Sequence, residues 1–153
     1  MSDEQPVFSI EKIYVKDASL EAPNTPQVFL EQVQPQVEVH LQHAGERIGD
    51  ALYQVVVTVT VTAKAGEKTC FLVEAAQAGI FQIRNVPDAD LEPILGITCA
   101  NILFPYARET VADMIARAGF PAIHLAPVNF EAMYAARQQA EAQQAGPRIE
   151  AAH

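Results

Sequence analysis

The sequence predicts one α+β domain: a four-stranded antiparallel sheet with one long helix packed on it and a short, mobile C-terminal helix. The length, 153 residues, is that of a single domain. Up to about residue 85 the segments are rich in β-branched residues and alternate with a period of two, and from residue 91 the period becomes helical. Short turns join the last three strands, which predicts an antiparallel meander, with a crossover after the first strand.

The first strand is predicted from Val7 to Val15, where β-branched and aromatic residues dominate, with residues 16–21 as a candidate extension. Its alternation is imperfect, which is typical of a bulge or of two covered faces. Residues 22–26, Ala-Pro-Asn-Thr-Pro, then end the strand because both prolines require extended neighbours. This breaker segment is the predicted crossover.

The meander is predicted from three alternating segments. Residues 37–42 form its first strand, and residues 44–51 form a polar turn. Residues 53–62 are the clearest strand signal, with Tyr53 and four valines on one face and mainly threonines on the other. After a hairpin turn, the last strand is predicted over residues 69–77, with Leu72 and Glu74 on one face.

The long helix is predicted over residues 91–118, with Asp90 as its N-cap and Gly119 as its C-terminal stop. Pro105 lies inside it and predicts a kink or break, because its ring clashes with the carbonyl group of Asn101. The first half of this helix is apolar nearly all round, so a second surface must cover it, and we expect that surface to be another subunit. The expected interface residues are Ile94, Ile97, Ile102 and Leu103.

Asn129 is expected to cap a last helix over residues 130–144, whose few apolar residues predict weak anchoring and mobility. Residues 1–6 and 145–153 are expected to be disordered, and residues 7–144 to form the single domain. The N-terminus has no apolar segment typical of a signal peptide, and no apolar run is long enough to cross a bilayer. Cys70 and Cys99 are too few and too far apart for a disulfide framework, which favours a reducing compartment. The sequence therefore predicts a cytoplasmic protein without membrane insertion.

The composition and the missing motifs argue against an enzyme. The formal net charge is −9, which excludes nucleic acid and anionic membranes as main partners but equally favours plain solubility. None of the three serines lies in a nucleophile elbow, and no glycine-rich phosphate loop is present. His40 and His43 fall on opposite faces of a predicted strand, so they cannot share a metal. No cofactor or metal is predicted.

Apolar residues outside regular elements indicate a binding surface instead. Val28, Phe29 and Leu30 follow the crossover, and a second proline-bracketed segment contains Phe120, Ile123 and Leu125. Such segments often bind other molecules, but they can equally seal the core of their own domain. The residues alone leave these two alternatives open.

Three segments resemble the SecB family of protein-export chaperones, over about residues 8–134. They are IYVKD with EAPN at residues 13–24, NILFPYARE at residues 101–109 and LAPVNF at residues 125–130. The resemblance implies a homotetramer, a dimer of dimers with the long helices between sheets. It implies an ATP-independent holdase that binds unfolded secretory precursors and delivers them to the SecA translocation ATPase. The match ends near residue 134, so contact of the C-terminal tail with SecA is not predicted.

The resemblance also implies particular residues. A SecA-binding face would comprise Asp17, Glu21, Leu72 and Glu74. A client groove would lie between the crossover, the sheet and the last helix, and would comprise Val28, Phe29, Leu30, Phe120, Ile123, Leu125, Met133 and Tyr134.

Three alternatives remain open from sequence. One is a SecB-like chaperone dedicated to a toxin–antitoxin client, which a charge-reversed version of the four SecA-binding positions would favour. The others are an oligomeric carrier of a small apolar ligand and an enzyme without recognisable motifs.

Overall fold

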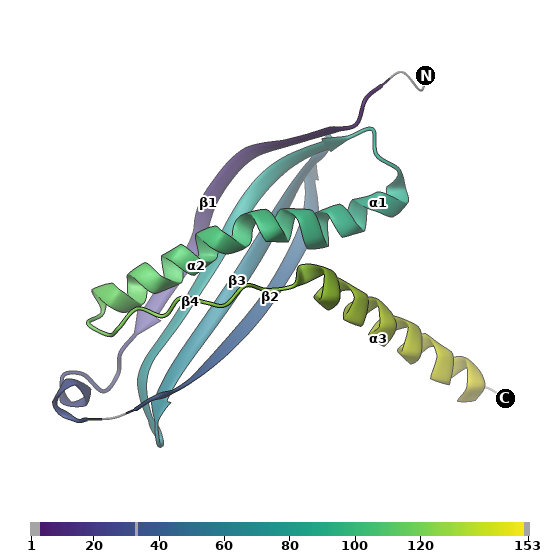
Figure 1. The fold of residues 1–153 in the computed structure, drawn as a ribbon. Coiled ribbons are helices and arrows are strands. Elements are labelled where there is room, and N and C mark those ends of the chain that lie inside the picture. Colours follow the sequence, from purple (N-terminus) through teal and green to yellow (C-terminus); the bar gives the residue numbers. More distant parts are fainter. Residues whose placement is uncertain (1–3, 33, 152–153) are drawn as a thin grey trace.

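The fold is a four-stranded antiparallel sheet with helices on one side, as predicted (Figure 1). The computed structural model describes residues 4–32 and 34–151. Its strands are β1 (Val7–Glu21), β2 (Gln36–Gly49), β3 (Leu52–Ala65) and β4 (Lys68–Arg84), in the order β1-β4-β3-β2. Strands β2, β3 and β4 form the meander, and β1 pairs with β4 after the predicted crossover, which contains a short 3-10 helix, η1 (Gln27–Leu30).

The two faces of the sheet follow from the alternation in β3. Val55, Val57, Val59 and Val61 are completely buried under the helices. The threonines between them point to the opposite face and are half-buried. Burial of a valine side chain contributes roughly 1.5–3 kcal/mol, so this row is a main source of stability. We call the side covered by helices the helix side and the other the open face.

Strands β2 and β4 extend well beyond their predicted ends. The predicted turn at residues 44–51 is largely strand, because β2 continues to Gly49 and the chain reverses at Asp50 and Ala51. Strand β4 continues to Arg84 rather than ending near residue 77. Its second half contains alanine and glycine, which are weak strand formers, but pairing with strands on both sides overrides that preference. In β1, two register shifts account for the imperfect alternation.

The long helix begins earlier than predicted and contains an irregular turn. It consists of α1 (Asp88–Pro93), a π-helical turn η2 (Ile94–Cys99) and α2 (Ala100–Arg117). The prediction of Asp90 as N-cap was wrong, because Pro87 occupies that position and no side chain caps the helix. The helix begins at Asp88, two residues before Asp90, so Asp90 lies inside the first turn rather than before it.

The break predicted at Pro105 is absent, and α2 runs through this residue. Both Pro105 and Asn101, whose carbonyl group loses its partner, lie on the exposed side of the helix. Water can therefore satisfy the freed carbonyl group. The irregularity lies upstream, in η2.

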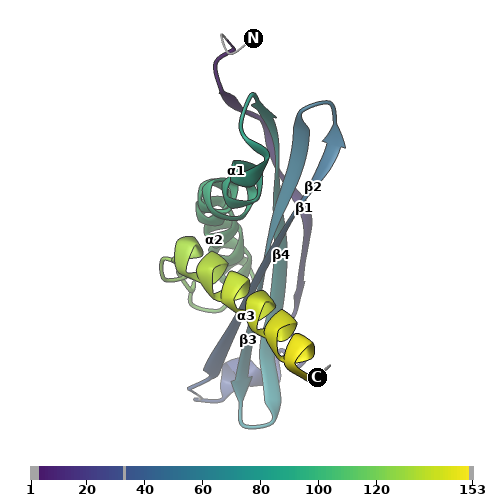
Figure 2. The ribbon, with the colours of Figure 1, turned by 90° about the vertical axis from the view of Figure 1, so that its right-hand side faces the viewer.

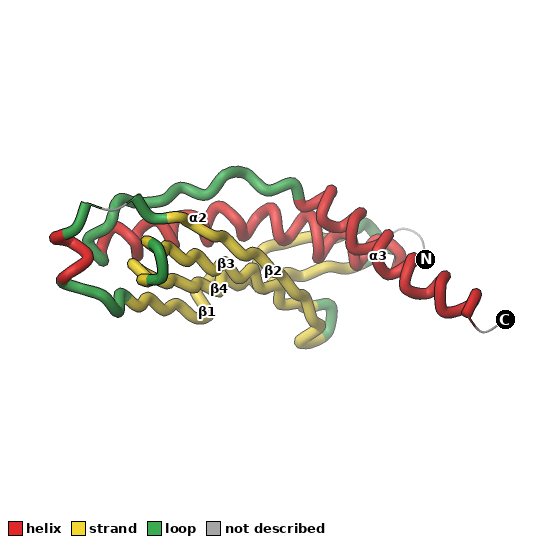
Figure 3. The backbone as a smooth tube through the Cα atoms, turned by 90° about the horizontal axis from the view of Figure 1, so that it is seen from below, coloured by secondary structure: helices red, strands yellow, loops and turns green. Residues whose placement is uncertain are grey.

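Gly119 ends the helix, as predicted, with φ of 94° and a hydrogen bond of 3.0 Å to the carbonyl group of Ala116. Residues 120–129 then run back along α2 as an extended segment (Figure 3). Helix α3 (Phe130–Ala151) follows, with Asn129 accepting a 2.9 Å hydrogen bond from the backbone of Ala132, the predicted cap. It continues past the predicted end at residue 144, into the segment expected to be disordered. Of the N-terminal segment, residues 1–3 lie outside the described residues, and residues 4–6 form no regular element.

The molecule has two layers. Seen along the edge of the sheet, α1 and α2 lie on one side and leave the other without a helix (Figure 2). Gly79 lets α2 approach closely, since a Cβ atom there would lie 2.9 Å from the Leu103 side chain. The fold thus presents two different faces, one with helices and exposed apolar edges and one bare.

Candidate functional site

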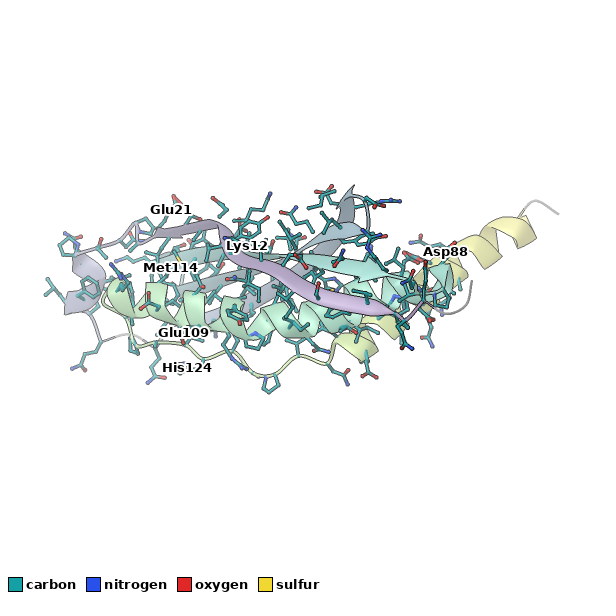
Figure 4. All side chains as sticks on the ribbon, turned by 90° about the horizontal axis from the view of Figure 1, so that it is seen from above. Lys12, Glu21, Asp88, Glu109, Met114 and His124 are labelled. Carbon is teal, nitrogen blue, oxygen red and sulfur yellow. The ribbon has the colours of Figure 1, made fainter. Side chains whose placement is uncertain are left out.

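The four residues assigned to SecA binding share the open face. Glu21 pairs directly with Leu72, Asp17 pairs with Ala76, and Glu74 lies between these two rows. Because paired residues in an antiparallel sheet point to the same side, all four project away from the helices. We call this set the acidic face: Asp17, Glu21, Leu72 and Glu74. Figure 4 shows Glu21 on the side of β1 away from α2, and Glu109 and His124 on the opposite side of the molecule.

The acidic face places one half-buried leucine among three carboxylates. Asp17 and Glu21 are exposed on the edge strand, whereas Leu72 and Glu74 are half-buried on the neighbouring strand. Thr60 donates a 2.8 Å hydrogen bond to Oε1 of Glu74. Within residues 4–32 and 34–151, none of the three carboxylates forms an ion pair with a lysine or arginine.

The apolar groove begins beside the crossover. The Phe120 ring lies 5.1 Å from the ring of Phe29 and 4.9 Å from that of Phe71. Phe29 also packs on Gly119, where a Cβ atom would lie 3.1 Å from its ring. Next to this cluster, the side chain of Leu30 is 84% exposed, so it does not contribute to the core of its own protomer. Exposed leucine beside clustered aromatic rings is typical of a binding surface.

Two of the predicted groove residues belong to the core instead. Val28 and Leu125 are only 7% and 8% exposed, and both pack in the main hydrophobic cluster. Val28 lies in the short 3-10 helix η1 and Leu125 in a segment without regular structure, and neither sequence has a periodic pattern that shows which side chains turn inward. Ile123 and Phe120 are half-buried beside them, so they retain some accessible surface.

The other end of the predicted groove lies under α3. Tyr134 packs on Gly96 in the π-helical turn, where a Cβ atom would lie 3.3 Å from its ring. The His43 ring contacts the Phe130 ring edge-on at 5.6 Å between centroids. Met133 and Tyr134 border a depression of about 330 Å³ with His43. These contacts hold the first turn of α3, while residues 135–144 are exposed.

Sequence reasoning missed residues of β2 that extend the groove. Val37 and Val39 pair with Ala63 and Val61, so they lie on the helix side, and α2 does not cover them. They are 42% and 49% exposed. Alternation predicted an apolar face on this strand, but not that its edge position leaves that face uncovered. The unpaired backbone of the edge strand lies beside these valines.

The predicted subunit interface is only partly on the surface. Ile94, Ile97 and Ile102 are half-buried along the long helix. Leu103 is completely buried against the sheet of its own protomer. Tyr106, which the sequence analysis did not select, is exposed on the outer side of α2.

Cysteines and histidines form no reactive cluster in the described part of the chain. Burial raises the pKa of the Cys99 thiol to about 12, so it stays protonated at neutral pH. His40 pairs with Thr60 and His43 with Val57, which puts them on opposite faces of β2 as predicted. Within residues 4–32 and 34–151, no group of three or more His, Cys, Asp and Glu side chains is arranged to hold a metal. In the same ranges, no helix is long and apolar enough to cross a membrane.

The open face carries three carboxylates around Leu72, and the helix side carries exposed apolar residues beside a strand edge, an arrangement typical of protein-binding surfaces. Comparison with known proteins agrees with this class. The family described as preprotein translocase subunit SecB matches residues 1–141. Protein-export protein SecB of Chromobacterium violaceum is 65% identical over 140 residues, which cover 90% of this chain and 93% of the relative. That of Dechloromonas aromatica is 61% identical over 140 residues, 92% of each chain.

The fold itself occurs in a solved structure. A SecB-like chaperone of Mycobacterium tuberculosis, solved with a peptide from an antitoxin, matches with a TM-score of 0.66 at 15% identity. The match covers 80% of this chain and 91% of that one. The chain belongs to the SecB family of protein-export chaperones.

Proposed function

We propose that the chain is an ATP-independent holdase that captures unfolded secretory precursors and delivers them to SecA. The observation that supports this most directly is the exposed apolar surface beside the β2 edge, formed by Phe29, Leu30, Val37 and Val39. An unfolded chain offers apolar side chains and unpaired backbone groups together. An apolar surface beside an unpaired strand edge can bind both without reading a particular sequence.

The helix side and the open face have different functions in this proposal. The client lies on the helix side, in the groove of Phe29, Leu30, Phe120, Ile123, Met133 and Tyr134, extended by the valines of β2. SecA binds the acidic face on the other side of the sheet. Its partner surface would carry lysine or arginine around an apolar pocket for Leu72, since charge complementarity accelerates association and a buried apolar anchor slows dissociation.

The working form is a homotetramer, a dimer of dimers. Ile97, Ile102 and Tyr106 keep accessible apolar surface along the outer side of the long helix. Strand β1 is an edge strand of 15 residues that pairs with β4 on one side only, and its Phe8 and Ile10 are exposed. Uncovered apolar surface and a long free edge both favour burial against further copies of the chain. Four copies would also give one client several weak sites, and hence avidity.

The protein works in the cytoplasm, where precursors have not yet been exported. Two buried, unpaired cysteines fit that reducing compartment. Captured segments are those that a folded protein hides, so slow-folding precursors are selected. SecA supplies the energy of transfer, and the holdase itself needs no nucleotide.

The test is capture of an unfolded precursor by the Leu30→Asp variant. Leu30 is exposed, so the charge should not disturb the fold, and we expect at least about tenfold weaker capture, since desolvating a charge in an apolar interface costs more than 1.4 kcal/mol. Ile48→Asp is the matched control, because Ile48 is also an exposed apolar residue but lies at the other end of β2. Isothermal titration with a reduced, unfolded precursor and with its folded form measures both affinities.

The proposal fails if wild-type protein binds folded and unfolded forms equally. Equal losses for the Leu30 and Ile48 variants would place the client elsewhere. Leu125→Asp is a poor probe, although Leu125 was predicted in the groove, because a charge at this core position should unfold the protein.

A further inference from the structure

We infer that Thr60 is a positioning residue for partner docking: its hydroxyl group holds the Glu74 carboxylate in the orientation that a cationic partner meets. This inference rests on the proposed docking of SecA at the acidic face. Thr60 itself is not among the residues that the resemblance assigns to docking. It lies on β3, which neighbours β4 on the side away from β1.

The register of the sheet puts Thr60 directly opposite Glu74. Their side chains share the open face, and the hydroxyl group donates to Oε1 at 2.8 Å. On the other side of Glu74, Ser19 of β1 is the paired residue, but within residues 4–32 and 34–151 it forms no hydrogen bond with the Glu74 carboxylate. Among the described residues, Thr60 is therefore the side chain that restrains the Glu74 carboxylate.

Glu74 differs from the other two carboxylates in how firmly it is held. Asp17 and Glu21 stand exposed on the edge strand β1, with no side-chain hydrogen bond in residues 4–32 and 34–151, whereas Glu74 is half-buried on an inner strand. Residues two apart on a strand share a face, so Glu74 stands next to Leu72, about 6.6 Å along β4. The ordered charge is thus the one beside the apolar anchor.

The hydrogen bond favours docking in two ways. It leaves Oε2 of Glu74 free for a lysine or arginine of the partner, since an ionised carboxylate has two acceptor oxygens. It also fixes a long side chain before the partner arrives, so less rotamer freedom is lost on binding. Asp17 and Glu21, which are not held in this way, act mainly on the rate of encounter.

The fold does not depend on this hydroxyl group. The backbone ladder between β3 and β4 extends over both strands, and the valines on the other side of β3 are completely buried. Thr60→Val keeps the shape and the β-branching of the side chain and removes only the donor. Thr60→Ser keeps the donor. Thr58→Val is a matched control, because Thr58 is also half-buried on the open face but pairs with Ala76.

The experiment is surface plasmon resonance of these variants of the full chain against immobilised SecA. We expect Thr60→Val to lose about five- to tenfold in affinity, mainly through faster dissociation, as for loss of a hydrogen bond to a charged group. Thr60→Ser and Thr58→Val should bind like wild type. Capture of an unfolded precursor should not change in any of them.

A double-mutant cycle separates positioning from a general effect on structure. If Thr60 acts through Glu74, the Thr60→Val and Glu74→Gln pair should cost less than the sum of the single changes. Additive losses, or unchanged binding by Thr60→Val while Glu74→Gln binds more weakly, would overturn the positioning role and leave the docking face standing. Unchanged binding by both Glu74→Gln and Leu72→Arg would instead overturn docking at the acidic face.

Discussion

At the scale of single residues, Leu72 is the side chain on which the docking proposal depends most. It is a half-buried leucine beside Glu74, with Glu21 opposite it on β1 and Thr62 opposite it on β3. An apolar side chain among carboxylates has no role in the core of its own protomer. Its position fits a partner that needs both charge and one apolar contact.

Charge reversal and loss of the leucine should affect different rate constants. Asp17→Lys combined with Glu74→Lys should slow association with SecA by about ten- to hundredfold at low salt, because it reverses the field of the face. Leu72→Arg should instead raise the dissociation rate by roughly thirtyfold, the effect of losing an anchor of about 2 kcal/mol. Surface plasmon resonance resolves the two rates.

Salt provides the control for this prediction. Wild-type association should slow as ionic strength rises from about 50 to 500 mM, where the screening length falls to a few ångströms. The double lysine variant should show little dependence. Wild-type kinetics in that variant would mean that the carboxylates are ordinary solvated surface.

What the sequence predicts at this scale depends on regular alternation. Alternation in β4 predicts Leu72 and Glu74 on one face of the sheet and Phe71 and Val73 on the other, and the register confirms both assignments. The sequence could not separate Val28, which is buried, from Leu30, which is exposed, because both lie in the four-residue 3-10 helix η1, which is too short for a periodic apolar pattern. Thr60 was missed because its partner lies on another strand, and single-strand alternation does not show the register.

At the scale of elements, the docking of α3 depends on a histidine. His43 of β2 contacts Phe130, and burial lowers its pKa below the ordinary value of 6.5, with a smaller contribution from the charge of Arg137. The cavity beside it is also bordered by Glu92 of α1 and by Glu141 of α3. Docked α3 therefore favours neutral His43 over its protonated form.

Acidification should loosen α3. When the folded pKa is lowered, the undocked state binds the proton more readily, so docking weakens as pH falls below about 6.5 and the loss levels off below the lowered pKa. We expect amide exchange over residues 130–144, corrected for intrinsic rates, to be several-fold faster at low pH. His43→Phe keeps the ring contact and should remove this dependence. If amide exchange depends equally on pH in the wild type and in the His43→Phe variant, His43 is not the source of the dependence.

The long helix shows why element boundaries are harder to predict than element types. Its existence and its end at Gly119 follow from periodicity and a glycine stop. The π-helical turn at Ile94–Cys99 cannot be predicted from periodicity, because it packs against β2 and α3, which are distant in the sequence. The same turn presents Gly96 to Tyr134, so an unpredicted irregularity positions the helix that borders the groove.

At the scale of the whole molecule, assembly should be sensitive to the outer side of the long helix. Ile102→Asp would put a charge into the proposed interface between dimers, and an unpaired buried charge costs several kcal/mol. We expect light scattering at micromolar concentration to show dimers in place of tetramers. Glu109→Gln, on an exposed position of the same helix, is the control. An unchanged mass for Ile102→Asp would place the interface elsewhere.

The central claim is that clients and SecA occupy opposite sides of one sheet. The exposed apolar residues of the groove lie on the helix side, and the acidic face lies on the open face, so neither partner should block the other. The direct test passes the protein over immobilised SecA, with and without a bound unfolded precursor. Opposite sites predict the same SecA association and dissociation rates in both cases, and a response larger by the mass of the precursor. If the precursor instead competes with SecA, the two sites overlap and the account is wrong.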